Sequence, residues 1–172
     1  AIDPRDNERR AGEGVSVITV PDNRWGRVDI KTVGLLPNVL AKQKAKDSGA
    51  YEAWLVDADG FVTEGSSTNA WIVTDGGTLI TRQADHGILR GITRSVVIDI
   101  AADMGLTLEE RHFSVAEALA AREAFLTSAS TLVTPIVRID GQQVADGRPG
   151  ALSMRLRKAF YDYAEIGARW TF

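Results

Sequence analysis

Two consecutive segments constrain the fold of this chain more than any other feature. Residues 51–65, YEAWLVDADGFVTEG, and residues 69–82, NAWIVTDGGTLITR, each contain an apolar run, a turn with Asp and Gly, and a second apolar run. This pattern is typical of β-hairpins, with turns expected at 57–60 and 75–77. Hairpins pair antiparallel strands, so they exclude strict βαβ alternation and favour a mixed α/β (α+β) domain.

Further strands and amphipathic helices are predicted along the rest of the chain. Apolar or alternating runs predict strands at 14–21, 106–114 and in both halves of 123–144, and a short strand or strand end at 26–33. Apolar residues at helical spacing predict helices at 35–49, 91–106, 115–121 and 150–166. Ser114 and Glu117 form a capping-box pattern. Leu36, Val39 and Leu40 are expected to share one face of the helix at 35–49.

Composition narrows the classes of function. The chain has 172 residues, enough for one domain, and its 44% hydrophobic and 25% charged residues are ordinary for a soluble globular protein. A net charge of −3 argues against nucleic-acid binding. With no cysteine and two histidines, disulfides and thiolate sites are excluded and no metal site is expected. Without a long apolar run or a signal-peptide pattern, we expect a cytoplasmic enzyme or binding domain with no membrane contact.

Lys31 and Glu64 are the first candidates for chemistry. Lys31 lies among Val28, Ile30 and Val33. A lysine amine in a desolvated pocket can form Schiff bases with carbonyl compounds, whereas an exposed strand lysine has no such role. Glu64, at a predicted strand end, has three possible roles: it pairs with an arginine, faces water, or holds a proton on a heterocyclic nitrogen. The third role suits a pyridine cofactor, whose protonated ring nitrogen acts as an electron sink.

Two further segments have the character of anion sites. In RGITRSVV, residues 90–97, Gly91 and Thr93 stand at the start of a predicted helix, where backbone N–H groups are unpaired. In TSAST, residues 127–131, every residue except Ala129 carries a hydroxyl. Each segment is also compatible with an ordinary helix cap or turn. Taken together, an amine, a carboxylate and two donor clusters are the groups that pyridoxal 5′-phosphate requires.

The order and context of these segments resemble the class IV, or fold type IV, pyridoxal-phosphate-dependent aminotransferases, and most closely the D-amino acid aminotransferases. The resemblance covers nearly the whole chain and is carried by residues 24–73, by GILRGITR at 87–94 and by residues 124–147. It implies that residues 1–172 are the C-terminal cofactor-binding domain of that family, with a mixed, barrel-like sheet and packed helices. Residues 1–13 would be a remnant of the interdomain connection and 166–172 a C-terminal tail.

The resemblance also implies a role for each site residue. Lys31 would form the Schiff base and shuttle a proton, Glu64 would hold the pyridine nitrogen protonated, and Leu89 would pack on the ring. The phosphate would be bound by two segments: the helix start with Gly91, Ile92 and Thr93, and the turn with Ala129 and Ser130. Arg24 and Ser67 would belong to the polar network around the cofactor. The N-terminal domain of the family is absent, so the chain is expected to be a fragment, a poor enzyme alone, and part of a homodimer.

The implied reaction is transamination of D-amino acids with 2-oxo acid acceptors. Branched-chain relatives carry a tyrosine five positions after the lysine, where this chain has Leu36. The alternatives are a branched-chain or amine transaminase and an aminodeoxychorismate lyase. An alternative of another class is a cofactor-free binding or assembly domain, in which Lys31 and Glu64 are structural.

Overall fold

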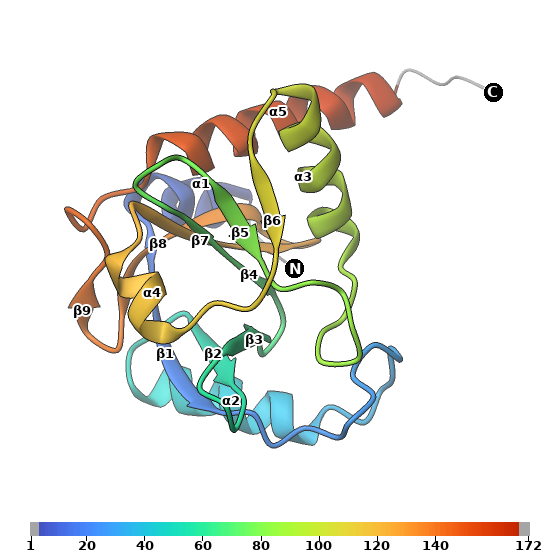
Figure 1. The fold of residues 1–172 in the computed structure, drawn as a ribbon, viewed down its shortest axis with the longest axis vertical. Coiled ribbons are helices and arrows are strands. Elements are labelled where there is room, and N and C mark those ends of the chain that lie inside the picture. Colours follow the sequence, from blue (N-terminus) through green and yellow to red (C-terminus); the bar gives the residue numbers. More distant parts are fainter. Residues whose placement is uncertain (1–3, 169–172) are drawn as a thin grey trace.

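A computed structural model describes residues 4–168 of the chain (Figure 1). The elements in chain order are α1 (Pro4–Glu13), β1 (Val15–Pro21), α2 (Leu36–Asp47), β2 (Glu52–Val56), β3 (Val62–Gly65), β4 (Asn69–Val73), β5 (Leu79–Thr81), α3 (Ile92–Asp103), β6 (Leu108–Glu110), α4 (Val115–Ala120), β7 (Glu123–Ser128), β8 (Leu132–Ile139), β9 (Gln142–Gln143) and α5 (Ala151–Ala168). Within these residues, no helix has the length and apolar character needed to cross a membrane.

The strands form one mixed sheet that curls until its edges meet. The strand order is β3-β2-β1-β8-β7-β4-β5-β6, and β9 pairs with β8. The β2–β3 and β4–β5 pairs are the antiparallel hairpins predicted from the sequence, whereas β1 is parallel to both β2 and β8. Phe61, just before β3, bridges to Ser114 beyond β6, and Val62 N donates to Phe113 O at 3.0 Å. This contact closes the sheet into the expected barrel-like form.

Both faces of the sheet are covered, and β4 shows how. Its side chains alternate, so Ala70 and Ile72 enter the cluster inside the curled sheet, while Trp71 and Val73 pack toward α3 and α5. Because every residue of β4 is buried, the strand has no polar face, and its sequence reads as a continuous apolar run after Asn69. Trp71 stacks on Phe125 with ring centroids 5.4 Å apart.

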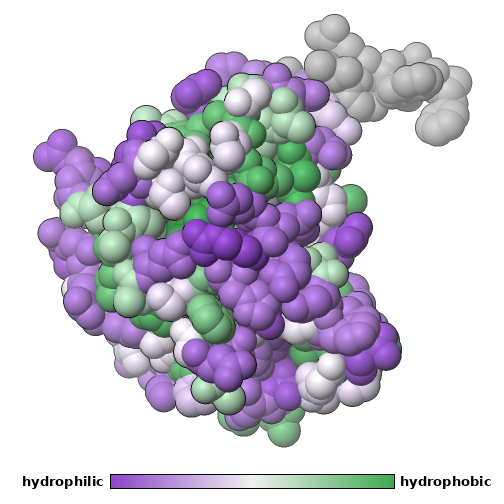
Figure 2. Space-filling model, viewed as in Figure 1, coloured by the Kyte–Doolittle hydropathy of each residue, from purple (hydrophilic) through white to green (hydrophobic). Residues whose placement is uncertain are grey.

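The helices lie against different parts of this sheet. In Figure 1, α3 and α5 lie together at the top, and α2 lies below against β1 and β2. Figure 2 shows that polar residues dominate the middle of this face, and apolar residues are visible near α3 and α5. The core face of α3 carries Val97, Ile100 and Ala101, as its helical spacing predicted. In α4, Glu117 N donates to Ser114 Oγ at 3.1 Å, which confirms the predicted cap.

Two predictions about strands need correction, and one predicted helix face is exposed. Residues 26–33 are not a strand; they form a turned loop in which Ile30 N donates to Arg27 O at 3.1 Å. The segment pairs with no strand of the described residues, so local contacts decide its shape. In α2, Leu36, Val39 and Leu40 share one face as predicted; that face is exposed, and Ala41 and Ala45 face the core. The strand expected at 106–114 is only the short β6.

The structure describes most of the first of the two terminal segments that the resemblance implied, and part of the second. Residues 4–13, predicted as part of a connection, form the helix α1, which packs against β8 and buries Ala11 completely. Residues 1–3 lie outside the described residues. Of the expected tail at 166–172, residues 166–168 belong to α5, and residues 169–172 lie outside the described residues.

Candidate active site

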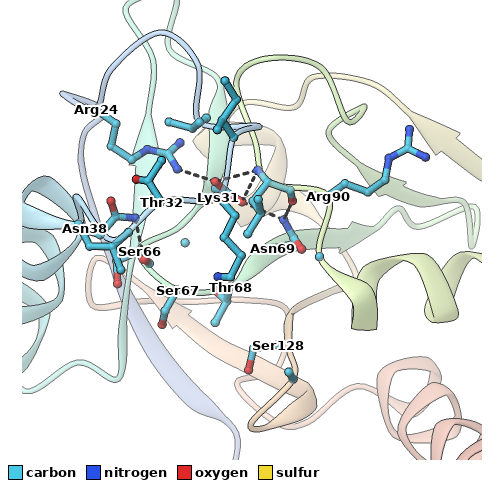
Figure 3. A pocket seen from close by; sticks show the side chains of 18 of the residues that line it. Arg24, Lys31, Thr32, Asn38, Ser66, Ser67, Thr68, Asn69, Arg90 and Ser128 are labelled. Atoms are coloured by element: carbon cyan, nitrogen blue, oxygen red, sulfur yellow. Dashed lines mark hydrogen bonds and ion pairs between the residues drawn. The ribbon is translucent and has the colours of Figure 1, made fainter.

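A cavity of about 640 Å³ lies where four separate segments of the chain meet (Figure 3). The loop from β1 to α2, the β3–β4 connection, the start of α3 and the end of β7 each form one wall. These walls contain every predicted site residue except Ser130, namely Arg24, Lys31, Glu64, Ser67, Leu89, Gly91, Ile92, Thr93 and Ala129. Residues from opposite halves of the sequence are therefore assembled around one space.

Lys31 enters the cavity from the loop between β1 and α2. The loop is shaped by a two-bond ion pair, in which Arg27 Nε and Nη2 donate to Asp29 at 2.9 and 2.8 Å. The side chain of Lys31 extends into the cavity between the labelled Asn69 and Ser67 (Figure 3). Of the two environments considered from the sequence, the structure shows the exposed one, but Lys31 lies in a loop and not in a strand. Its amine is placed for chemistry but lies open to water.

Glu64, in β3, is a buried carboxylate with both oxygens bonded, and its residue is only 5% exposed. Arg24 Nη1 donates to Oε1 at 2.5 Å, Asn69 Nδ2 donates to Oε2 at 2.9 Å, and Leu89 N lies 3.2 Å from both oxygens. Burial raises the pKa of Glu64 to about 7, although Arg24 and the Leu89 N–H oppose this shift. Of the three roles considered from the sequence, pairing with an arginine is the one these contacts establish.

Asp22 fixes the arginine that holds Glu64. Arg24 donates to Asp22 through Nε at 2.9 Å and through Nη2 at 2.7 Å, and Thr63 Oγ1 donates to the same carboxylate at 2.7 Å. Burial disfavours the charge on Asp22, but the hydrogen bonds and charge of Arg24, together with the Thr63 hydrogen bond, lower the pKa of that carboxyl. One guanidinium thus lies between two carboxylates. Asp22 and Thr63 were not predicted, since an isolated Asp or Thr gives no local signal.

Asn69 links the carboxylate to the start of α3, a role that no local sequence signal indicated. Its Nδ2 donates to Glu64 and also to Leu89 O at 2.9 Å. A Cβ on Gly91 would lie 2.3 Å from Asn69 Oδ1, a distance that real contacts do not reach. Gly91 is therefore required by the close approach of Asn69. The positive φ that often explains a glycine does not apply, because its φ is −65°.

The start of α3 and the end of β7 face the cavity with hydrogen-bond donors. Gly91 is the N-cap of the 12-residue helix Ile92–Asp103, and no side chain of the described residues caps it. Its first backbone N–H groups are consequently available to an anion. Thr93 is buried, whereas Ile92 is 70% exposed. On the β7 side, Ser128 and Ala129 line the cavity.

The structure divides the roles in the 127–131 segment differently from the sequence analysis. Ser130, predicted at the site, is exposed and does not line the cavity, whereas Ser128 does. The Ser128 hydroxyl lies 3.1 Å from Ser130 Oγ and 2.8 Å from Thr131 Oγ1. The hydroxyl-rich composition of this segment was the signal that located the turn. That composition could not show which serine of the turn lines the cavity.

Two serines of the β3–β4 connection donate hydrogen bonds to a buried carboxylate. Glu52 is 0% exposed, and it accepts from Ser66 Oγ at 2.5 Å and from Ser67 Oγ at 2.9 Å. Asn38 Nδ2, at the start of α2, donates to Ser66 O at 2.9 Å. Ser67, predicted as part of the polar network around the cofactor, therefore donates its hydrogen bond to Glu52. These bonds fix the wall of the cavity opposite α3.

Two leucines complete the description of the predicted residues. Leu89 lines the cavity beside Glu64 and is half-buried. Leu36, which we compared with the tyrosine of branched-chain relatives, is 67% exposed and does not line the cavity, whereas its neighbour Leu35 does.

Among residues 4–168, no three side chains of His, Asp or Glu are placed to hold a metal ion.

Comparison with known proteins agrees with this geometry. The sequence pattern of the Amino-transferase class IV family matches residues 3–139, so the chain belongs to that family. Class IV aminotransferases depend on pyridoxal 5′-phosphate, as the resemblance implied. The recognition of the family and of its mixed, barrel-like fold from the sequence is therefore confirmed.

Several relatives lie close in sequence or structure. The chain is 45% identical over 156 residues to a D-alanine aminotransferase of Listeria innocua and 41% identical over 152 residues to one of Bacillus licheniformis, covering 91% and 88% of this chain. It spans about half, 53%, of each relative. The branched-chain aminotransferase of the archaeon Thermoproteus uzoniensis, solved with norvaline, has a TM-score of 0.78 at 35% identity, covering 87% of this chain and 51% of that one.

Proposed function

We propose that this chain is the cofactor-binding part of a pyridoxal-phosphate-dependent transaminase that acts on D-amino acids with 2-oxo acid acceptors. The observation that carries the proposal is the convergence of Lys31, Glu64 and two donor-rich segments on one cavity of about 640 Å³. The D-alanine aminotransferases at 41% and 45% identity support the choice of substrate class.

The residues of the cavity fit pyridoxal 5′-phosphate in their chemistry. The start of α3 and the Ser128–Ala129 turn offer N–H and O–H donors for the phosphate, and Gly91 leaves its backbone uncovered. Glu64 offers an acceptor for the protonated ring nitrogen. Burial gives this carboxylate a pKa of about 7, and a cationic N–H beside it would favour its ionised form. The bound cofactor supplies an electron sink for the bond cleaved at the substrate Cα.

Each polar residue then has a defined task. Lys31 Nζ is the amine that would hold the cofactor, and once released it would accept a proton from the substrate Cα and deliver it to C4′ of the cofactor. Arg24 and Asn69 hold Glu64 in place with bonds of 2.5 and 2.9 Å, so the carboxylate needs little reorganisation. Leu89, beside Glu64, offers the ring an apolar contact and reduces access of water.

The choice of amine rests on the relatives rather than on the cavity. The chain spans about half of the curated relatives, and by resemblance the groups that clamp the substrate carboxylate belong to an N-terminal domain. The branched-chain aminotransferase structure at 35% identity supports a branched-chain transaminase as the second candidate. From the same resemblance we propose a homodimer that acts in the cytoplasm. The exposed apolar side chains Val39 and Leu40 on α2 support association with another surface.

The experiment uses the protein that carries this chain. Bound cofactor should give a visible absorbance band that borohydride abolishes, with the added mass on the peptide containing Lys31. Turnover is then compared for D-alanine, L-leucine and 1-phenylethylamine, each with 2-oxoglutarate or pyruvate. D-alanine should be fastest. Faster turnover of L-leucine would refute the substrate class and leave the cofactor site intact, whereas a protein without the band would favour the cofactor-free alternative.

A further inference from the structure

The turn between β7 and β8 has two sides with different functions. Ser128 and Ala129 face the cavity, while the backbone carbonyls of Ser130 and Thr131 are bonded to elements on the other side. Leu132, directly after the turn, has a φ of 58°, which is uncommon for a residue with a side chain. A backbone of this kind persists only where neighbouring contacts fix it. The origin of those contacts therefore decides the shape of the cavity wall.

The first contact comes from α1. Asn7 Nδ2 donates to Ser130 O at 2.7 Å across 123 positions of sequence. In a trans peptide the C=O and the following N–H point in opposite directions. Fixing the Ser130 carbonyl toward Asn7 thus turns the Thr131 N–H the other way, and it donates to Ser128 Oγ at 3.2 Å. Through this peptide, α1 orients Ser128, a residue that lines the cavity.

The second contact comes from Arg157 of α5, whose side chain is only 3% exposed. Its Nη1 donates to Thr131 O and Val133 O, both at 2.8 Å, and therefore bridges the residue with the positive φ. Its Nη2 donates to Glu8 Oε1 of α1 at 2.7 Å. A buried guanidinium requires such a partner, so Glu8 holds Arg157 in position. Tyr161 OH also donates to Glu8, at 2.7 Å.

We propose that Asn7, Glu8 and Arg157 form a brace that positions the β7–β8 turn to receive the phosphate of the cofactor. The proposal rests on the proposed function and deepens it, since it assigns to α1 a share of the phosphate site. None of the three lines the cavity. They are positioning residues that act through the peptide and hydroxyl of the turn. Pyridoxal, which lacks the phosphate, gains nothing from the brace and provides the discriminating ligand.

The test measures the dissociation constants of pyridoxal 5′-phosphate and pyridoxal by absorbance titration for the protein that carries this chain and for four variants of it. Asn7→Leu and Arg157→Met remove the two contacts. Arg9→Ala and Lys158→Met are matched controls on the exposed sides of the same helices, where the wild-type side chains are 55% and 78% exposed. Losing one or two hydrogen bonds predicts about 3- to 30-fold weaker binding of the phosphorylated ligand in the first pair. Pyridoxal binding should change less than about twofold.

Each outcome decides the proposal. Selective loss for the phosphorylated ligand in Asn7→Leu and Arg157→Met, with both controls like wild type, supports the brace. Equal loss for both ligands would show general destabilisation and overturn it, as would unchanged binding of both. A wild-type protein that binds neither ligand would instead remove the proposed cofactor, and the brace with it, before any variant is compared.

Discussion

Arg24 Nη1 lies 2.5 Å from Glu64 Oε1, and the two side chains are 5% and 7% exposed. The same guanidinium is bonded to Asp22, so three charged groups share a space that little water reaches. Charges in such a place are stable only as a set, because removing one leaves another buried without a partner. These contacts fix the Glu64 carboxylate beside the cavity. A change in any of the three groups should therefore affect both the stability of the fold and the site.

Breaking the pair should therefore destabilise the fold strongly. Arg24→Met should lower the free energy of unfolding by about 3–5 kcal/mol, because Glu64 and Asp22 lose their buried partner. The double variant with Glu64→Gln should lose less than the sum of the two single variants. Urea unfolding of the four proteins measures this coupling. Ala replacement of Lys158, which pairs with Asp162 on the surface, serves as control and should change stability by under about 1 kcal/mol. Additive losses would refute the coupling.

The raised pKa of Glu64 predicts how stability changes with pH. The carboxyl has an ordinary pKa of 4.5 and a folded-state pKa of about 7, so between these values the folded chain binds more protons than the unfolded chain. The stabilising contribution is complete below about pH 4.5 and disappears as the pH rises through 7. It amounts to roughly 3 kcal/mol at most. Glu64→Gln should flatten this decrease in urea unfolding experiments at about pH 5–8. An equal slope in both proteins would contradict the shift.

Lys31→Ala should abolish the covalent attachment of cofactor. No borohydride-trapped adduct should remain by intact mass, and turnover by the protein that carries this chain should fall by about 10²-fold or more, since the proton-transfer group is lost. Lys44→Ala, on the exposed side of α2, is the control and should keep both signals. A trapped adduct on any other lysine peptide would show that Lys31 has been misassigned.

Gly91→Ala should disturb the site through a steric clash. The added Cβ would lie 2.3 Å from Asn69 Oδ1, and this side chain supports Glu64. We expect a loss of about 1–3 kcal/mol in the free energy of unfolding, partly recovered when Asn69→Ala is combined with it. Gly12→Ala in α1 is the control, because its Cβ meets nothing within 4 Å. A Gly91→Ala protein as stable as wild type would mean that Gly91 and Asn69 can move apart at little cost in free energy.

The exposed apolar face of α2 should make the chain associate. Leu36, Val39 and Leu40 are 67%, 58% and 58% exposed, and Val33 in the preceding loop is 99% exposed. Sedimentation velocity should show mass rising with concentration, and Val39→Glu with Leu40→Glu should suppress the effect. Gln142→Glu with Gln143→Glu, in the exposed strand β9, adds the same charge outside α2 and is the control. Association that persists in the double variant would place the contact elsewhere.

Much of the fold was predictable because its signals are local. The turns of both hairpins, the buried face of α3 and the Ser114 cap were read from periodicity and turn chemistry, and the structure confirms them. The strand predicted at residues 26–33 was wrong, because strand formation depends on a partner that is distant in the sequence. Val and Ile favour a strand only where another strand pairs with it, and this loop has no such partner in the part of the chain that the structure describes.

Prediction of the site was limited in a similar way. Lys31, Glu64 and the 127–131 segment were chosen by residue type and resemblance, and all three reach one cavity. Asn69 and Asp22 were missed because their roles come only from contacts across the fold. Ser128, which lines the cavity, could not be distinguished from Ser130, which does not, since both occur in the same polar run.

The sequence by itself determined which chemical groups this protein possesses, the order of most of its strands and helices along the chain, and its family. Those properties follow from side-chain identity and from short-range periodicity. Only the tertiary structure decided that Lys31 is exposed, that Arg24 binds Glu64, and that α1 reaches the β7–β8 turn through Asn7. The reason is that burial and hydrogen bonding depend on which distant segments meet. Here the curling of one mixed sheet brings them together.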